Sequence, residues 1–243
     1  MKPLLLAVAL WTAAGLASSL SAQNPSQDPD RLYADRERAQ SARDAASIWE
    51  ARLKKDPKDF ESAWKLARAC YWLGGHLAED QQRAQYERGI EAGRQASVLQ
   101  ADRPEGYFWM AANMGAMAES FGLRQGIKYR GPVKKALETV LMIDRDFQQG
   151  SADRALGRWY LKVPRLFGGS KDKSVEHLRQ SLTYDPSSTA SHYFLAETYL
   201  EMDRKNEARQ EAQKVIDLPV NPEWAPEDRE FKQKAKALLD RLR

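Results

Sequence analysis

Four stretches of the chain share one pattern, in which a large apolar residue is followed by a small residue and, three positions later, by another large residue. Spacings of three and four place these side chains on one face of an α-helix. The small residue lets a second helix approach closely, and the large residues fill the groove beside that contact. The pattern therefore predicts a stack of paired helices. The small residues are Ala67, Ala111, Gly157 and Ala196.

Acidic turns punctuate the same region, and proline follows most of them. A residue before proline is pushed out of the helical conformation, so each turn ends one helix and opens the next. The segments between the turns are rich in Ala, Leu, Glu, Lys, Arg and Gln, which favour helices, and nothing after the first residues reads as a strand. We predict an all-α fold. The turns are Asp56-Pro57, Asp102-Arg103-Pro104, Asp144-Arg145-Asp146, Asp185-Pro186 and Asp217-Leu218-Pro219.

The repeated unit resembles the tetratricopeptide repeat, whose first helix carries the large, small, large pattern and whose second helix carries small residues facing it. Ala208, Ala212 and Val215 fit that second helix in the last unit. The small residues lie 44, 46 and 39 positions apart, whereas the typical period is about 34. We predict a right-handed helical-repeat solenoid of divergent, lengthened tetratricopeptide-like units.

Most of the extra length is expected between the two helices of a pair, at Gly74-Gly75-His76, at 122–131 and at 163–171. Gly168-Gly169 suits a helix end that needs positive φ, and Ser170 can cap the following helix. A phosphate loop would need GxxxxGK[ST] after a buried strand, which this corner lacks.

Both ends of the repeat region are predicted to be helical. Apolar or small residues recur from Leu32 to Leu53 and predict one long amphipathic helix that stops at Asp56. From Pro226 to Arg243 the apolar residues share one face, which is typical of a capping helix on a solenoid; a helix on a membrane surface is the alternative.

The first residues have the order of a secretory signal peptide. One lysine precedes a short apolar run from Leu4 to Ala17, and small residues follow up to Ala22. We predict a signal peptide over 1–22, a flexible leader over 23–30 and a single repeat domain over 31–243; an uncleaved membrane anchor is the alternative. No cysteine follows the apolar run for lipid attachment, and the expected location is periplasmic or otherwise exported.

Composition offers little sign of catalysis. The chain has three histidines, one cysteine and a net charge of +4, with no recognised catalytic or metal motif. We expect a non-enzymatic protein without cofactor, metal or nucleic-acid partner, in which Cys70 is buried and inert. A hydrolase or transferase would have to assemble its site from scattered residues.

The concave face of such a solenoid is lined by the first helix of each pair. Aromatic rings and guanidinium groups together suit a small apolar anion or an extended peptide ending in a carboxylate. The alternative is that the aromatics belong to the core and the arginines are solvated. The candidates are Trp64, Arg68, Tyr71, Phe108, Arg154, Arg158 and Tyr193.

The lengthened corners hold a second candidate surface, with Leu123, Tyr129, Leu166 and Phe167. We expect these side chains to fold inward as a plug. The alternative is that they point outward, with Leu166 and Phe167 available to a partner.

Two segments carry a family resemblance. Gly106-Tyr107-Phe108-Trp109-Met110-Ala111-Ala112 is one, and Ala155-Leu156-Gly157-Arg158-Trp159-Tyr160 with the Val163 to Ser170 corner is the other. Over about 50–220 the chain resembles the T component of tripartite ATP-independent periplasmic (TRAP) transporters.

The resemblance implies an all-helical periplasmic accessory protein that binds a substrate-binding protein and handles hydrophobic or organic-acid ligands. A homo-oligomer or another envelope partner is also compatible with it. The runner-up is a general tetratricopeptide scaffold for envelope assembly or secretion that binds extended peptides.

Overall fold

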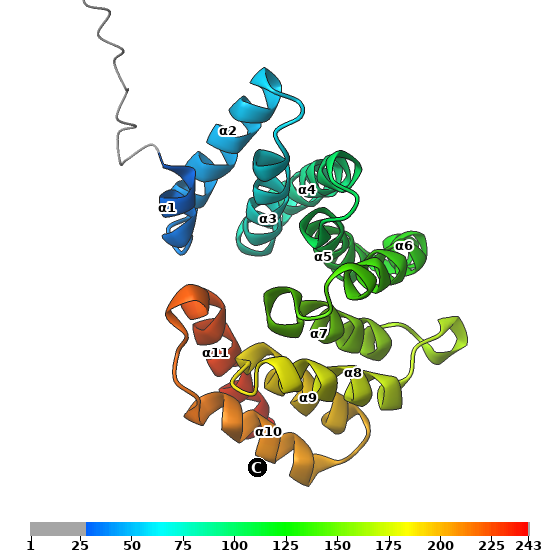
Figure 1. Cartoon of the computed structure of the whole chain (residues 1–243). Coiled ribbons are helices and arrows are strands. Elements are labelled where there is room, and N and C mark those ends of the chain that lie inside the picture. The colour runs from blue at the N-terminus through cyan, green and yellow to red at the C-terminus, as the bar shows by residue number, and fades with distance from the viewer. Residues whose placement is uncertain (1–27, 243) are drawn as a thin grey trace, which may run out of the picture.

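The computed structural model describes residues 28–242 and is all-α in that range, with eleven α-helices, two short 3-10 helices and no strand (Figure 1). The predicted signal peptide and most of the predicted leader lie outside the described residues. Five helical pairs follow one another, and a single last helix ends the chain. The pairs are α1 (Pro29–Ala34) with α2 (Ala39–Lys55), α3 (Phe60–His76) with α4 (Glu79–Leu99), α5 (Pro104–Ser120) with α6 (Gly122–Ile143), α7 (Phe147–Lys162) with α8 (Lys171–Tyr184), and α9 (Thr189–Glu201) with α10 (Lys205–Asp217). The last helix is α11 (Ala225–Arg241).

The small residues of the repeat pattern lie in the core, as predicted. Ala67 and Ala196 are fully buried, and Ala111 is nearly so. At Gly157 a Cβ atom would lie 2.5 Å from Cγ of Leu178, so α7 approaches α8 more closely than alanine allows. Ala208, Ala212 and Val215 are also fully buried. The prediction of a right-handed, tetratricopeptide-like helical-repeat solenoid is confirmed.

The prediction of one long first helix is wrong. The chain forms α1, breaks over 35–38 and resumes as α2. Asp35 stabilises the break, because its carboxylate accepts a hydrogen bond from Ser41 Oγ at 2.9 Å. The Arg36 carbonyl accepts a second one from Nε1 of Trp72 in α3, also at 2.9 Å. Tertiary contacts therefore override the local helical pattern.

Two of the three predicted corners are instead helical. Gly74 and Gly75 lie inside α3, where Gly74 faces the ring of Tyr86 so closely that a Cβ atom would clash. Residues 122–131 belong to α6, which begins directly after α5 with Gly122 at φ +77°. The units are lengthened here by longer helices, not by longer loops.

The third corner is a true corner. Between α7 and α8 the chain forms the 3-10 helix η2 (Arg165–Phe167), and Gly168 takes φ +99°. Ser170 Oγ accepts a hydrogen bond from the Lys173 amide at 3.3 Å and caps α8 as predicted. The Ser170 amide donates to the Tyr160 carbonyl at 2.9 Å, which holds the corner against α7.

The last helix covers the final repeat, which confirms the capping prediction. Ala235 and Leu238 are buried against Ala212 and Val215 of α10, with Phe231 beside them. The 3-10 helix η3 (Pro222–Trp224) leads into α11. No helix among residues 28–242 is both long and apolar enough to cross a bilayer.

Candidate functional site

The concave face is formed by the first helices of the pairs, α3, α5, α7 and α9, and α11 lies at its open end (Figure 1). Several of the residues predicted to line this face are engaged with the protein itself. Trp64, Arg68, Phe108, Arg158 and Tyr193 are in this group.

Arg68 is surrounded by aromatic rings. Its guanidinium carbon lies 4.2 Å from the ring centre of Tyr33 and 5.0 Å from that of Trp64. Its Nη2 lies 3.7 Å from Oδ1 of Asp30. Burial lowers the pKa of Arg68 from its usual value. Tyr33 and Asp30 belong to α1, so the first helical pair covers Arg68 and Trp64.

Arg158 ties three helices together. Its Nε and Nη2 atoms donate to Glu119 of α5 at 2.8 and 2.6 Å, and Nη1 donates to Glu197 of α9 at 3.2 Å. This bidentate pairing offsets the desolvation of Arg158 and leaves its pKa raised. A guanidinium held by two carboxylates has little capacity left for a ligand.

Two of the predicted aromatic residues are packed within the protein. Phe108 is 9% exposed and lies in the core, with its ring centre 5.5 Å from that of Phe147. The expectation that Phe108 lines the exposed concave surface is therefore wrong. Tyr193 is half-buried, with its ring centre 5.6 Å from that of Phe231 in α11.

Tyr71 and Arg154 remain available on the concave face. The side chain of Tyr71 is 42% exposed, yet the surrounding protein desolvates its hydroxyl and raises its pKa. The exposure and the raised pKa are consistent with a side chain that water reaches but that protein surrounds on several sides, as on a concave surface. Charges on α5, α7 and α11 act on this hydroxyl, from Arg158, Glu119, Glu227 and Glu230.

Arg154 lacks a carboxylate partner in the part of the chain that the structure describes. Its one hydrogen bond runs from Nη1 to Ser188 Oγ and is long, at 3.4 Å. Burial lowers the pKa of Arg154, and Asp185 and Tyr71 oppose this effect only in part. The folded protein has already removed much of the water around this guanidinium, so a ligand carboxylate that binds it incurs little further desolvation of the cation. The attraction between the two charges is also stronger where less water surrounds them.

Three side-chain contacts join the first helical pairs to α11, and no pattern in the sequence indicated them. Arg36 Nε donates to Glu227 at 2.9 Å, and Nη2 donates to the same carboxylate. Arg229 pairs with Glu37, and the partners in these two contacts are 191 and 192 positions apart. We call them the closing contacts; they bring the two ends of the arc together (Figure 1).

His76 makes the third closing contact, at the end of α3. Its ring stacks on Trp72 with the ring centres 3.7 Å apart, its Nδ1 lies 2.7 Å from the Trp72 carbonyl, and its Nε2 meets Glu230 of α11. Partial burial is the largest single effect on His76 and lowers its pKa, but Glu230 and the Trp72 carbonyl together outweigh it, so the pKa of His76 is raised. Glu230 has a lowered pKa in return.

The other two histidines and the cysteine are engaged or buried within the protein. His177 and His192 each lie 2.6 to 2.7 Å from one carboxylate, of Asp153 and Glu211 respectively. Cys70 is fully buried, which raises the pKa of its thiol to about 12. Within residues 28–242 no group of three or more His, Cys, Asp or Glu side chains could hold a metal ion.

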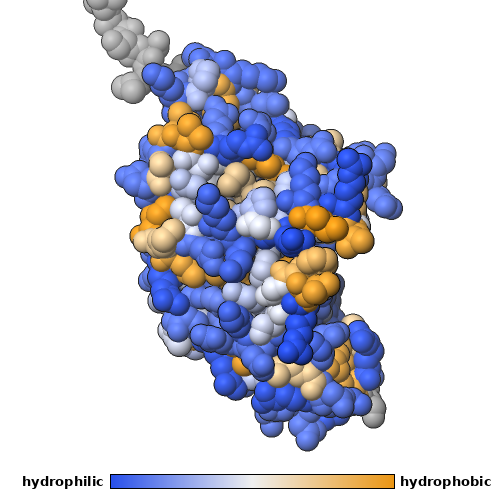
Figure 2. Space-filling view, turned by 90° about the vertical axis from the view of Figure 1, so that its right-hand side faces the viewer, coloured by the Kyte–Doolittle hydropathy of each residue, from blue (hydrophilic) through white to orange (hydrophobic). Residues whose placement is uncertain are grey.

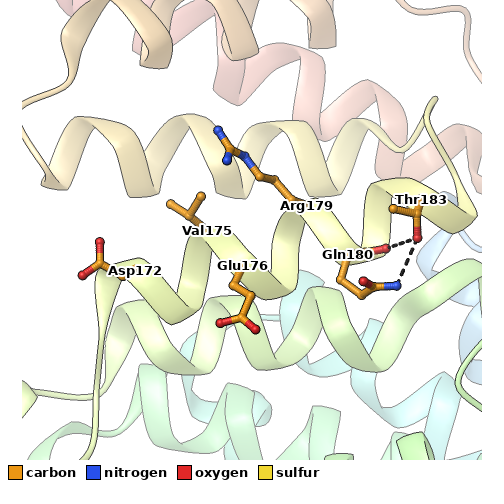
Figure 3. A pocket seen from close by; sticks show the side chains of 6 residues that line it. All are labelled: Asp172, Val175, Glu176, Arg179, Gln180 and Thr183. Carbon is orange, nitrogen blue, oxygen red and sulfur yellow. Dashed lines mark hydrogen bonds between the residues drawn. The ribbon is translucent and has the colours of Figure 1, made fainter.

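A shallow depression runs along α8, lined by Asp172, Val175, Glu176, Arg179, Gln180 and Thr183 (Figure 3). All six residues come from one helix, so no second element brings groups to converge on a ligand. Arg179 already donates to the Tyr199 hydroxyl at 2.8 Å. A second depression, lined by Glu79, Asp80, Arg83 and Phe121, also lies away from Tyr71 and Arg154.

The model of one protein family matches residues 26–167, which is more than half of the chain. Its description is "Regulator of microtubule dynamics protein 1-3". The chain belongs to this family. The family match spans α1 to η2 and therefore includes Tyr71, Arg154 and Arg158. None of the proteins with curated descriptions matches the chain in sequence.

Solved structures share the fold. A tetratricopeptide-repeat protein of Thermus thermophilus, TTC0263, is 21% identical with a TM-score of 0.66, and the match covers 88% of this chain and 98% of that one. A double mutant of MamA from RS-1 is 17% identical with a TM-score of 0.51, over 81% and 96% of the two chains. A monomeric mutant of IFIT1 with Gppp-AAAA is 18% identical with a TM-score of 0.55, over 83% of this chain and 42% of that one. At these identities the likeness establishes the tetratricopeptide-like fold.

Proposed function

We propose that this protein is a non-catalytic scaffold that binds an extended segment of a partner protein along its concave face. The observation that carries the proposal is Arg154, a desolvated guanidinium without a carboxylate partner among the described residues. Tyr71 is exposed on the same face and close enough to affect the pKa of Arg154. A guanidinium that binds a carboxylate, beside a ring that supplies apolar contact area, suits an acidic side chain or a terminal carboxylate of a peptide.

A peptide fits this face better than an enclosed small molecule does. Neither surface depression is lined by Tyr71 or Arg154, and the Tyr71 ring is open to water. A small apolar anion would leave much of its surface exposed, whereas a chain segment can contact several first helices at once.

The finer proposal is that the partner is an exported one. The TRAP T-component resemblance favours a periplasmic substrate-binding protein, and the runner-up is an envelope protein under assembly or secretion. The family description concerns microtubule dynamics in the proteins that it names. We do not extend the microtubule activity to this chain, and the repeat architecture rests on the structure itself.

Site-specific photo-crosslinking in producing cells tests the proposal. The photoreactive residue p-benzoylphenylalanine replaces Tyr71 in one variant and Val98 in the control, because Val98 is 77% exposed on α4, a second helix of its pair. We expect crosslinked partners from position 71 that are absent from position 98. Adding Arg154→Gln should remove them, since the amide cannot pair with a carboxylate.

The same experiment separates the candidates. A crosslinked substrate-binding protein supports the transporter role, and a set of unrelated envelope proteins supports the scaffold role. Identical crosslinks from positions 71 and 98, or crosslinks that persist with Arg154→Gln, would contradict a concave binding face centred on Arg154. Native mass spectrometry of the same variants detects a small anion, which is the remaining alternative.

A further inference from the structure

The face opposite the concave side carries an apolar patch that the proposed function does not use. Eight large apolar side chains are exposed in the described part of the chain, and four of them lie here, on α6 and in η2. They are Leu123 (73% exposed), Ile127 (49%), Leu166 (87%) and Phe167 (40%). The expectation that the lengthened corners fold inward is therefore wrong for Leu123, Leu166 and Phe167, and right for Tyr129, which is 9% exposed.

One hydrogen bond and one cation–π contact hold α6 against α7 and η2. Nε1 of Trp159 in α7 donates to the Arg130 carbonyl of α6 at 2.8 Å, and the Arg130 guanidinium lies 4.6 Å from the ring centre of Phe167. Leu123, Ile127 and Arg130 lie four and three positions apart, so they form one stripe along α6 that leads to Phe167. We call Leu123, Ile127, Leu166 and Phe167 the α6–η2 patch.

The corner is built so that Leu166 points outward. The amides of Phe167 and Gly169 both donate to the Pro164 carbonyl, at 2.8 and 3.2 Å, and close a tight turn. Gly169 is packed against the Val163 carbonyl without room for a Cβ atom. The turn projects from the body of the molecule between α7 and α8 (Figure 1). Hydrogen bonds and packing fix this corner, so the 87% exposure of Leu166 is a feature of the folded structure.

Positive charge is concentrated around the patch. Residues 122–135 and 161–173 together hold nine basic side chains and one acidic one, a net charge of +8. The whole sequence has a net charge of only +4, so all the other residues together carry −4. Figure 2 looks onto this side of the molecule and shows apolar groups set among strongly hydrophilic ones.

Most of these basic side chains lack an acidic partner. Three of the nine pair with a carboxylate, namely Lys134 with Glu138, Lys162 with Glu197 and Lys171 with Glu201. The other six make no ion pair with any of residues 28–242. Arg124, Lys128 and Lys135 form a second stripe on α6 beside Leu123 and Ile127, and Arg130, Arg165 and Lys173 complete the six.

We propose that the α6–η2 patch docks the protein on an anionic lipid bilayer, with Leu166 and Leu123 entering the headgroup region and the basic side chains bound to lipid phosphates. A fluid bilayer accommodates a projecting apolar corner without a pre-formed pocket, whereas a folded protein partner would need a complementary hollow. Apolar side chains ringed by Lys and Arg are the chemistry of peripheral membrane binding. A second copy of this chain is disfavoured, because two basic rims would repel each other.

A fluorophore at position 166 tests this directly. Leu166→Cys is labelled with the environment-sensitive dye NBD, which reacts there selectively because Cys70 is fully buried. The labelled full chain is titrated with vesicles of phosphatidylcholine alone and of phosphatidylcholine with about 30% phosphatidylglycerol. We expect a blue shift and quenching by lipid-bound quenchers with the anionic vesicles, and neither change with the neutral ones. Because the dye responds only to its own surroundings, the blue shift reports contact of position 166 itself with lipid.

Matched variants separate local insertion from general adsorption. Val98→Cys carries the same dye at a site that is also highly exposed, at 77%, and should show no shift. Arg124→Glu with Lys128→Glu, in the Leu166→Cys background, should weaken binding to the anionic vesicles at least about tenfold. Arg43→Glu with Lys58→Glu makes the same change of charge at exposed positions elsewhere and should have a much smaller effect.

Three results would overturn the proposal. The first is an unchanged spectrum at position 166 with anionic vesicles at low salt. The second is an equal response at positions 98 and 166, which means non-specific adsorption. The third is a response to an acidic polypeptide such as polyglutamate but not to vesicles, which means that the patch serves an acidic protein.

Discussion

Removing the Glu227 carboxylate tests whether the closing contacts hold the two ends of the protein together. The side chain of Arg36 is 5% exposed and that of Glu227 is 26% exposed. In Glu227→Ala, Arg36 keeps only the carbonyls of Glu223 and Tyr33 as acceptors, at 3.2 and 3.5 Å. Leaving a fully buried charge without its partner costs about 3–5 kcal/mol. Because water reaches one quarter of Glu227, we expect a loss of about 2–3 kcal/mol in the free energy of unfolding.

Urea unfolding followed by circular dichroism measures this loss, and hydrogen exchange of the α11 amides shows whether it is local to the closing contacts. Glu91→Ala is the matched control, because it breaks an ion pair with Arg94 in which both side chains are more than half exposed. That variant should lose about 0.5 kcal/mol or less. A Glu227→Ala protein as stable as Glu91→Ala, with unchanged exchange in α11, would refute the reasoning.

Two further predictions concern packing and pH. Gly157→Ala should lose about 1–3 kcal/mol of unfolding free energy, because the added methyl group meets Leu178. The control Gly115→Ala should be neutral or slightly stabilising, because nothing lies within 4 Å of its new Cβ atom. Urea unfolding measures both variants, and equal effects would contradict the close α7–α8 contact. The pKa of His76 is higher in the folded protein than in the unfolded chain, where it is about 6.5. The contact with Glu230 therefore stabilises the fold fully below about pH 6.5, and this contribution is lost as the pH rises through the pKa of His76 in the folded protein. His76→Ala should therefore cost more stability at pH 6 than at pH 8.5, and an equal cost at both would show that the contact is not ionic.

The repeat architecture was predictable because its signals are local. The large, small, large pattern, the turns before proline and the Ser170 cap each act within a few residues, and each has the predicted role in the structure. The last helix was also predictable, since its apolar face had to cover Ala212 and Val215 of the preceding pair.

The failures have physical causes. Gly74-Gly75 looked like the corner itself, but both lie in the last turn of α3, where the lack of a side chain at Gly74 admits the Tyr86 ring of α4. Phe108 lies on α5, a first helix, at a position that its register assigned to the concave face, yet the neighbouring ring of Phe147 covers it. In both cases the deciding contact comes from another helix, so the spacing within one helix could not reveal it.

The assignment of the concave face was limited in the same way. The register of the first helices selected Arg68, Arg154 and Arg158 as equivalent candidates. Only the carboxylates and rings contributed by other units distinguish the partnered Arg158 and the covered Arg68 from Arg154. Which guanidinium is left without a counter-ion is a property of the assembled arc.

The closing contacts also bear on how the chain folds. In an open repeat array each unit touches only its neighbours, so folding can begin anywhere and the end units fray independently. Here Arg36 and Glu227 meet only after all the helical pairs between them have stacked in the right curvature, and the entropy of closing so long a loop is lost at that step. Joining the ends should therefore be a late event in folding, which gives a linear array some of the cooperativity of a globular domain.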